Sequence, residues 1–333
     1  MKIDELIRAL PTLTEYQVNQ LCEEASVFLK LNEELTECTP TVCPKCLQEK
    51  TGFIKKGHSG LKQRYQCKEC GKKFTYDATQ LTAHSRQSKE NWNIALKDTF
   101  LLEPIDRTAR KLRVSHVTAF NMRHKILQFL EKLTETDKKL GDLVEADETF
   151  VLESEKGSRH ITRKPRRHGS KASTRGISHE QYCVCVATDR NHKIVAKCVN
   201  RAKPSSQDIE NALGKHIEDN TVFQCDGAAA YNRLIESKHC KKIVLVTHES
   251  YDKVHHLNTV NALHSRFQDM IKKFHGIASK YLNRYAALFC VINEFCGHSI
   301  DELTDLQRQK MINTPLDTTL RQVFSQDSLL ILS

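Results

Sequence analysis

The 333-residue sequence predicts a mixed α/β fold between residues 142 and 299, preceded by a small metal-stabilised module and a pair of helices. Three observations predict this organisation. Strand-like and helix-like segments alternate after Leu143, with three strands before the first helix. Two of the strand-like runs end in an aspartate, at Asp147 and Asp226. Far upstream, two Cys-x-x-Cys pairs have the spacing of a zinc module.

Charge is distributed unevenly along the chain, which carries a net +10 and has a pI near 8.9. Residues 1–40 hold three basic and eight acidic side chains, whereas residues 43–76 hold nine basic and two acidic. Residues 156–179 hold eight basic side chains and no acidic one. A charge run usually marks a solvated face. Two basic blocks beside a zinc module and two strand-end aspartates favour nucleic acid as a polyanionic partner.

The sequence indicates a soluble protein with reduced thiols. Its opening, MKIDE, turns acidic at once and is not a signal peptide. No apolar run approaches the roughly 20 residues that a membrane helix needs. The 13 cysteines are an odd number, and several lie in apolar runs where cysteine packs as a small hydrophobe. We therefore expect a cytoplasmic, nucleoid-associated protein with no membrane partner.

Residues 1–40 are expected to form a helical segment. Thr14 and Gln17 are the two ends of a capping box. An apolar stripe at helical spacing follows and comprises Val18, Leu21, Cys22, Ala25, Phe28 and Leu29. The acidic balance of this segment favours packing or protein contact over the main contact with DNA.

Residues 41–77 are expected to form a zinc ribbon. Each Cys-x-x-Cys makes a tight knuckle, and two knuckles on facing hairpins complete a tetrahedral four-sulfur site. The four ligands are Cys43, Cys46, Cys67 and Cys70. Gly71 supplies the backbone freedom that such a knuckle needs. A closed site of this kind holds one structural Zn²⁺ and does no chemistry. The alternatives are a redox pair or unligated thiols.

Residues 85–135 have the pattern of a helix-turn-helix. Ser115 is placed to cap the second helix. That helix is expected to present to DNA the side chains of Thr118, Asn121, Arg123 and Lys125. An ordinary helical hairpin has a similar sequence pattern and stays open as the alternative.

The segment 142–299 has the alternation of a mixed α/β domain. The expected strands are Leu143–Leu152, Tyr182–Thr188, Lys193–Val199, Thr221–Cys225 and Ile243–Thr247. Helices are expected from Ser205 to His216, after Asp226, and from near Asn258. Three strands, helix, strand, helix, strand, helix is the order of the ribonuclease-H-like fold. In that fold, carboxylates lie on the first strand, after the fourth strand and on a late helix.

A basic insertion at residues 156–179 lies between the first two expected strands. With Pro165 and Gly169, it is expected to be a mobile loop that orders on a phosphate backbone. The side chains expected to contact DNA there are Arg163, Lys164, Arg166 and Arg167. Residues 300–333 are expected to be a C-terminal tail.

The strand-end aspartates suit metal-dependent chemistry on phosphodiesters. Two divalent ions can serve both ends of an in-line displacement, and Mg²⁺ or Mn²⁺ prefers oxygen ligands. Asp147 and Asp226 therefore predict a site for two such ions, and Glu145 shares the strand face of Asp147. After Asp226, Gly227 and small residues leave room for a phosphate or an ion. A single strand-end aspartate is usually a turn or helix cap, but two in this fold order favour catalysis.

A third ligand is expected on the helix that starts near Asn258. Its apolar stripe comprises Val260, Leu263, Phe267, Met270, Ile271 and Phe274. Asn261 and His264 lie on the polar side, and spacing does not choose between them. The alternative for His264 is a surface histidine with no role. If His264 is the ligand, its ordinary pKa of about 6.5 predicts lower activity in mildly acidic buffer, and Mn²⁺ should serve at least as well as Mg²⁺.

The chain resembles insertion-sequence transposases of the zinc-ribbon DDE class, between about residues 41 and 295. The matching segments are the ribbon Cys43–Phe74, Thr118–His124, Val144–Phe150, Cys225–Tyr231, Val260–Ser265 and Phe274–Leu282. The resemblance implies that Asp147 and Asp226 are the first two catalytic residues. Relatives often carry glutamate where His264 stands, and some subgroups use histidine or asparagine. A basic residue about two turns later is typical, and Lys272 or Lys273 fits it.

The resemblance implies a DNA transposase that binds the terminal inverted repeats of its element, cleaves one strand at each end and joins the freed 3′-OH to target DNA. Double-stranded DNA is then the partner, and joining two ends implies a homo-oligomer on DNA. Two alternatives stay open. A DNA-binding regulator on an inactive nuclease fold would need neither aspartate, and a structure-specific nuclease or resolvase would cut without strand transfer.

Overall fold

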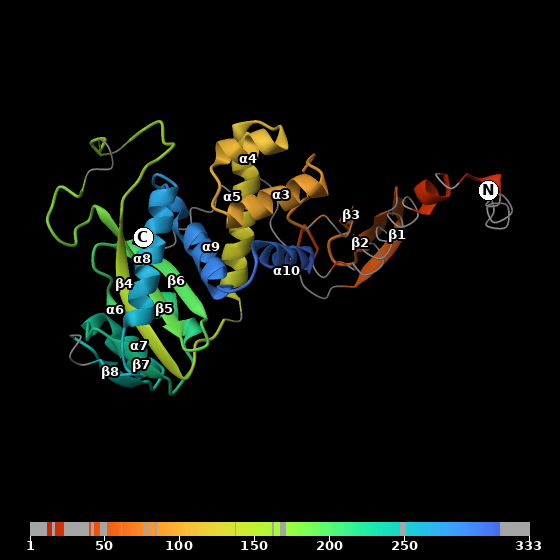
Figure 1. The fold of residues 1–333 in the computed structure, drawn as a ribbon. Coiled ribbons are helices and arrows are strands. Elements are labelled where there is room, and N and C mark those ends of the chain that lie inside the picture. Colours follow the sequence, from red (N-terminus) through yellow and green to blue (C-terminus); the bar gives the residue numbers. More distant parts are fainter. Residues whose placement is uncertain are drawn as a thin grey trace. The chain divides into compact units, whose positions relative to one another are not determined.

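The computed structural model describes residues 12–14, 17–22, 40, 43–46, 52–60, 62–75, 78, 80–83, 85–136, 138–161, 163–166, 171–246 and 251–313, without the side chains of residues 309, 312 and 313. The chain divides into two compact units (Figure 1). One unit comprises residues 1–83 with 312–317, and the other comprises residues 84–311 with 318–333.

The first unit contains a short helix and a small sheet. Thr14 N donates to Gln17 Oε1 at 2.9 Å and Gln17 N donates to Thr14 Oγ1 at 3.4 Å, which is the predicted capping box. Residues 17–22 are helical, and the residues on both sides of them, including the second half of the predicted apolar stripe, lie outside the described part of the chain. The sheet contains β1 (Phe53–Ser59), β2 (Lys62–Cys67) and β3 (Lys73–Thr75), paired antiparallel in that order.

The second unit begins with three helices: α3 (Lys89–Phe100), α4 (Ile105–Leu112) and α5 (His116–Glu135). The sequence predicted a helical pair at the positions of α4 and α5. Ser115 caps α5 as expected, because its hydroxyl accepts from Thr118 N at 3.1 Å. Arg113 ends α4 in the left-handed region at φ 53°, which makes the tight turn between the two helices. Helix α3 was not expected, because its buried face mixes apolar residues with Asp98 and Thr99.

A buried carboxylate, paired with a partly exposed lysine, holds these helices together. Asp98 on α3 is 2% exposed and accepts from Thr108 Oγ1 at 2.9 Å and Lys111 Nζ at 2.6 Å, both on α4. Arg123 on α5 reaches Thr108 Oγ1 at 3.4 Å. Buried charges are stable when they are paired and hydrogen-bonded, so this network fixes the three helices as one bundle.

A mixed five-stranded sheet follows, with the order β6-β5-β4-β7-β8. The strands are β4 (Leu143–Leu152), β5 (Gln181–Asp189), β6 (Ile194–Arg201), β7 (Val222–Cys225) and β8 (Lys241–Val244). The first three pair antiparallel, whereas β7 and β8 are added parallel to β4. The first four strands lie where the sequence predicted them. The fifth begins two residues earlier than expected, at Lys241.

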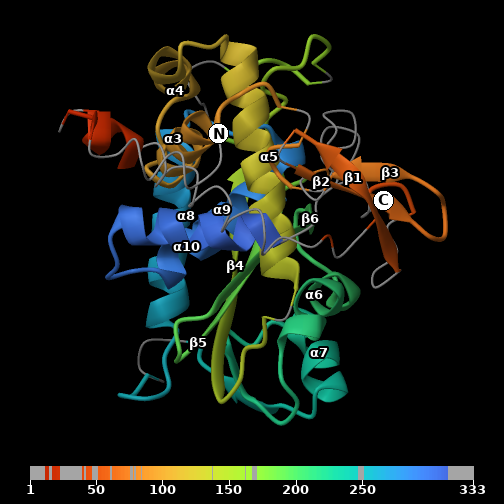
Figure 2. The same cartoon turned by 90° about the vertical axis from the view of Figure 1, so that its right-hand side faces the viewer.

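Helices cover both faces of this sheet (Figures 1 and 2). One face packs α6 (Ser206–Leu213) and α7 (Asn232–Ser237) on a core that includes Val144, Ala146, Cys185 and Phe223. The other face carries α8 (Asn258–Lys273) and α9 (Leu282–Glu294). Alternate residues of β4 therefore point to two different helical layers.

The remaining elements complete the second unit. Helix α10 (Ile300–Asn313) occupies the start of the predicted C-terminal tail. Between α5 and α9, Arg284 is 1% exposed, lies 3.5 Å from Glu131 Oε2 and contacts His124 Nδ1 at 3.3 Å. Burial lowers the pKa of His124 to about 3, so the imidazole stays neutral beside this arginine. None of the helices in the described part of the chain has the length and apolarity that crossing a bilayer requires.

Candidate active site

The sheet register brings Asp147 and Asp226 together. Strands β4 and β7 pair in parallel, with Glu145 opposite Gln224. The paired positions end there, and Asp147 and Asp226 each follow two residues later, close enough for the charge of Asp226 to raise the pKa of Asp147. Neighbouring strands lie about 4.8 Å apart, and residues two apart share a face. Asp147 therefore shares the α8-facing side of β4 with Glu145, and Asp226 lies in the turn directly after β7.

Gly227 shapes the turn that orients Asp226. Its φ is +91°, and a Cβ there would lie 2.8 Å from Val244 Cγ1, so a side chain is excluded on both counts. The turn lets Asp226 Oδ1 accept from Ala228 N at 2.9 Å. This bond fixes one carboxylate oxygen and leaves Oδ2 available to a ligand on the exposed side.

Asp147 is held in a similar way but is more buried. Its Oδ1 accepts from Glu148 N at 2.9 Å. Burial, and then the negative charge of Asp226, raise the pKa of Asp147 to about 6 from an ordinary 3.8. The carboxylate therefore lies where a positive charge would stabilise its ionised form.

His264 projects from α8 toward Asp147. Its Nδ1 lies 3.7 Å from Asp147 Oδ2, and its side chain is 13% exposed. Its Nε2 is buried and has no hydrogen-bond partner among the described residues. One turn later, Gln268 Nε2 donates to Thr149 Oγ1 and Phe150 O, both at 2.9 Å, which fixes α8 over β4.

The pKa expected for His264 needs correction. Burial lowers it to about 4, well below the ordinary value that predicted titration in mildly acidic buffer. The imidazole is therefore neutral at physiological pH and keeps a lone pair for a metal ion or a proton. Activity lost between pH 7 and pH 5 would not come from protonation of His264.

The other two candidates on α8 stand apart from the aspartates. Asn261 is exposed, and no contact joins it to Asp147 or Asp226 among the described residues. The side chain of Lys272 is 75% exposed and pairs with Asp269 at 3.0 Å. The helix thus brings His264 to the carboxylates and leaves Asn261 and Lys272 facing solvent.

Glu148 is a further ionisable side chain next to Asp147 that the sequence pattern did not indicate. Burial, together with the charges of Asp147 and Asp226, raises its pKa to about 6. Its carboxylate lies beside the hydroxyl of fully buried Tyr231, and this interaction lowers the pKa of Glu148 in part. Strand alternation points Glu148 to the face opposite Asp147, so only its position next to an aspartate could have suggested it.

Four of the cysteines in the first unit, Cys43, Cys46, Cys67 and Cys70, form a compact metal-binding set. Their sulfur atoms all lie within 4.8 Å of one another, with Cys43 and Cys70 at 3.5 Å and Cys46 and Cys67 at 3.8 Å. Tetrahedral zinc with Zn–S bonds of about 2.3 Å separates sulfur atoms by roughly 3.8 Å. Gly71, at φ +68°, closes the second knuckle, and Gly71 N donates to Cys67 O at 3.0 Å. The set fits the predicted Zn²⁺ site.

The ligand atoms of Asp147, Asp226 and His264, here called the acidic site, are less tightly clustered than the four sulfur atoms, but their chemistry suits a divalent cation. Among the described residues, the cysteines are the only set of three or more potential ligands that lie within such a distance of one another. Asp147, Asp226 and His264 are therefore spaced more widely. Two carboxylates repel each other when no cation lies between them, which gives a physical reason for the spacing. One oriented and one available oxygen on each aspartate, with an unpartnered His264 Nε2, suit an ion that prefers oxygen and tolerates nitrogen.

Two of the four side chains expected to contact DNA from α5 lie inside the bundle. Arg123 and Lys125 are 3% and 6% exposed, and burial lowers the pKa of Lys125 to about 8. Arg123 belongs to the Asp98 network, and Lys125 lies over Trp92. The expectation that these two face DNA is therefore corrected: each is needed to pack α5. Thr118 and Asn121 are partly exposed.

The basic insertion is anchored at its base. Lys156 Nζ donates to Phe274 O and Gly276 O, each at 3.0 Å, at the end of α8. Arg166 donates to Glu153 O at 2.5 Å and Glu180 Oε2 at 3.2 Å, so its charge is paired within the protein. The other residues expected to contact DNA lie differently. Lys164 is exposed, Arg163 is half-buried and donates to Lys164 O, and Arg167 lies outside the described residues.

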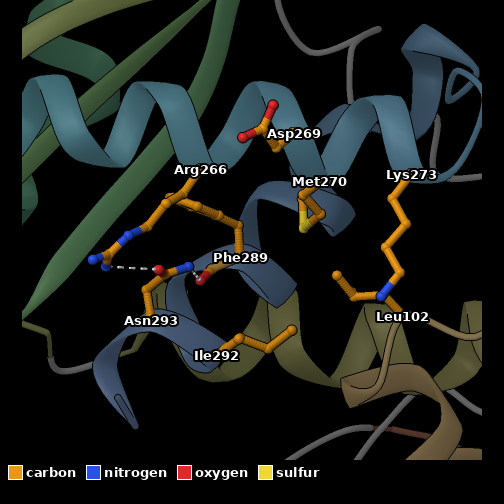
Figure 3. Close-up of a pocket in the computed structure, with 8 residues that line it drawn as sticks. All are labelled: Leu102, Arg266, Asp269, Met270, Lys273, Phe289, Ile292 and Asn293. Atoms are coloured by element: carbon orange, nitrogen blue, oxygen red, sulfur yellow. Dashed lines mark hydrogen bonds between the residues drawn. The ribbon is translucent and has the colours of Figure 1, made fainter. Parts of the chain in front are cut away.

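A pocket of about 280 Å³ lies between α8, α9 and the loop after α3 (Figure 3). Its walls come from α8, α9 and the loop after α3, and its floor includes Met270 and Phe289. Arg266 donates to Asn293 Oδ1 at 3.4 Å at one end. The pocket contains neither aspartate and is separate from the acidic site.

The chain is similar to proteins of mobile elements. Residues 139–290 match the family of ISXO2-like transposase domains. An uncharacterised protein in the transposable element ISH50 of Halobacterium salinarum is 25% identical over 256 residues, covering 74% of this chain and 83% of that protein. The resemblance to insertion-sequence transposases that the sequence predicted is confirmed. The matched segment contains Asp147, Asp226 and His264.

Solved structures of Mos1 transposase assemblies are also similar, at greater distance. A pre-cleavage Mos1 transpososome matches with a TM-score of 0.25 and 13% identity, covering 69% of this chain and 80% of that one. A Mos1 strand transfer complex matches with a TM-score of 0.23 and 12% identity, with the same coverage.

Proposed function

We propose that this protein is a DNA transposase that binds the terminal inverted repeats of an insertion sequence, cleaves a strand at each end and joins the end to target DNA. The observation that carries the proposal is the register of β4 and β7. Each aspartate follows one of the paired residues Glu145 and Gln224 by two positions, and His264 Nδ1 on α8 lies 3.7 Å from Asp147 Oδ2. The strand order β6-β5-β4-β7-β8 supports a ribonuclease-H-like assignment, with the first aspartate on the central strand.

Asp147 and Asp226 would hold two Mg²⁺ or Mn²⁺ ions, with His264 as the third ligand. Such ions supply a Lewis acid for the phosphodiester and stabilise the attacking and leaving oxygens. The protein groups prepare this site. Ala228 N and Glu148 N each fix one aspartate oxygen, and Gln268 holds α8 against β4. The same carboxylates can serve cleavage and joining, because only the nucleophile changes from water to a sugar hydroxyl.

DNA recognition would be shared among several surfaces. The zinc ribbon, with its basic residues, and the α4–α5 helix-turn-helix would bind the element ends. Thr118 and Asn121 remain the candidates on α5, since Arg123 and Lys125 are buried. The insertion would bind the phosphate backbone through exposed cations such as Lys164.

One assay tests the proposed function. Purified protein is incubated with labelled element ends, a target plasmid and Mg²⁺ or Mn²⁺, and the products are separated by size. We expect nicked ends and end–target joints that depend on the metal ion and on the end sequence. Cleavage without joints would favour a nuclease or resolvase. End binding with neither product, in both metal ions, would favour a regulator.

A further inference from the structure

Glu145 lies two residues before Asp147 on the same face of β4 and is 1% exposed. Its carboxylate lies at the start of α8. Oε2 accepts from Thr259 N at 3.0 Å and Val260 N at 3.1 Å, and Oε1 accepts from Thr259 Oγ1 at 2.8 Å. Helix N-termini carry unpaired N–H groups and partial positive charge, so this carboxylate caps α8 from a neighbouring strand.

The Glu145 carboxylate has no oxygen left for a metal ion. Arg190, in the turn between β5 and β6, donates to Oε1 and also donates to Val254 O at 2.6 Å. His256 Nδ1 lies 3.3 Å from Oε1 as well. Both oxygens are thus occupied by protein groups, whereas Asp147 and Asp226 each keep one oxygen available. Glu145 shares a face with the metal-binding carboxylates but has a different environment.

A second buried side chain repeats this arrangement on the next strand. Gln224 lies two residues before Asp226, is fully buried and stands opposite Glu145 in the ladder. Its Oε1 accepts from His256 N at 3.3 Å. Each proposed catalytic aspartate therefore follows, two residues later, a buried polar group that holds the segment 256–260.

We propose that Glu145 is a positioning residue that fixes the start of α8 against the sheet so that His264 meets Asp147. Gln224 supports it through His256. The inference rests on the proposed function for its catalytic consequence, but the contact itself does not. His264 lies about one and a half turns beyond Thr259, so a displaced helix start would move the imidazole relative to Asp147.

Three substitutions of Glu145 distinguish the effect of its side-chain length from the effect of its negative charge. Glu145→Gln loses the charge and keeps one acceptor oxygen at the same reach for the α8 amides, while its NH2 group replaces the oxygen that accepts from Arg190. Glu145→Asp keeps the charge but is one methylene shorter, so it falls short of the α8 amides. Glu145→Ala removes both. Glu294→Ala is the matched control, because Glu294 also accepts from a backbone amide, Ile194 N at 2.6 Å, and from a cation, Lys138 at 2.5 Å, at another place.

Hydrogen–deuterium exchange on the full chain tests the contact without any activity. Exchange at Thr259 and Val260 should rise in Glu145→Asp and Glu145→Ala, stay near wild type in Glu145→Gln, and be unchanged in Glu294→Ala. Amides later in α8 should remain protected in all variants that fold. Unchanged exchange at the start of α8 in Glu145→Asp would overturn the inference. If Glu145→Ala does not fold, the difference in exchange between Glu145→Gln and Glu145→Asp still tests whether Glu145 holds the start of α8.

Joining kinetics test the consequence. We expect kcat to fall roughly 10- to 100-fold in Glu145→Asp, as for residues that orient metal ligands, with KM for the DNA end unchanged and with Glu145→Gln restoring most of the rate. An active Glu145→Asp beside an inactive Glu145→Gln would mean that charge, and not reach, matters, which contradicts positioning. If wild type does not join ends at all, the proposed function fails while the exchange experiment still judges the contact.

Discussion

At the residue scale, the ionisation of Asp147 follows from its surroundings. Burial and Asp226 raise its pKa to about 6, whereas burial lowers that of His264 to about 4. As pH falls through about 6, Asp147 takes up a proton and its metal-binding oxygen is lost, while His264 is still neutral. We expect joining to fall with a midpoint near pH 6 that moves lower when Mg²⁺ is raised, because metal and proton compete. A midpoint that ignores Mg²⁺ would contradict this assignment.

The same shift affects stability without metal. A folded-state pKa above the unfolded value means that the folded protein binds the proton more tightly, so this stabilisation is present below pH 4 and is lost as pH rises toward 6. Asp147→Asn removes the ionisable group, and Asn keeps an oxygen for Glu148 N. The variant should therefore become more stable than metal-free wild type above pH 6, by on the order of 3 kcal/mol at most. Thermal melts at pH 4 and pH 7 measure the difference, and an equal difference at both would refute it.

Asp147→Asn and Asp226→Asn should have a common effect on chemistry. Each change deletes a negative oxygen ligand at nearly constant volume, so end binding should persist. Cleavage and joining should fall roughly 100-fold or more, since the charge stabilisation by a metal ion is worth several kcal/mol. Gel shifts and product gels measure the two properties. Near-normal joining in Mg²⁺ by either variant would remove that aspartate from the site.

Geometry favours His264 over Asn261 as the third ligand. His264 is half-buried beside Asp147, whereas Asn261 is exposed. His264→Ala should be nearly inactive and His264→Glu partly active, because a carboxylate restores a ligand. Asn261→Ala should be milder, and Mn²⁺ should support wild type at least as well as Mg²⁺. An active His264→Ala together with an inactive Asn261→Ala would mean that Asn261, and not His264, is the third metal ligand.

At the element scale, the ribbon depends on its four sulfurs. Its apolar cluster is small: it consists of Cys43, Tyr65, Cys67 and Phe74, with a few partly buried neighbours. So small a core needs a metal ion to fold. We expect one zinc per chain, and Cys70→Ser should release it, unfold the ribbon and abolish end-specific binding. The melting of the sheet domain should stay unchanged. Cys296→Ser is the control, since Cys296 lies outside the set. Freshly purified protein without zinc would contradict the site.

The strands and helices of the second unit show how much secondary structure the sequence patterns could predict. The strands β4 to β7 were expected where they lie because each is a bounded, β-rich run beside turn residues. Helix α3 was not expected, because it buries Asp98 and Thr99 beside apolar residues and so lacks a clean stripe. The DNA-facing side of α5 was misjudged at Arg123 and Lys125, since a charged residue at helical spacing does not reveal a buried partner such as Asp98.

At the scale of the whole molecule, two element ends must be held together for joining, and one chain has one pair of Asp147 and Asp226. We therefore expect at least two chains on paired ends. Light scattering of the protein with and without end DNA measures this, with an end lacking the inverted repeat as the control. A complex with one chain that still joins two ends would contradict the expectation.

By itself the sequence determined the alternation of strands and helices, the four cysteines and the two strand-end aspartates, because these depend on periodicity and short spacing. Tertiary structure decided which residues meet. The parallel pairing of β4 and β7 brings Asp147 near Asp226, and the packing of α8 brings His264, rather than Asn261, toward Asp147. It also placed Glu145 against the start of α8 and left Glu148 half-buried on the other face of the sheet. Pairings between residues 79 to 119 positions apart depend on how layers pack, and no local pattern encodes that.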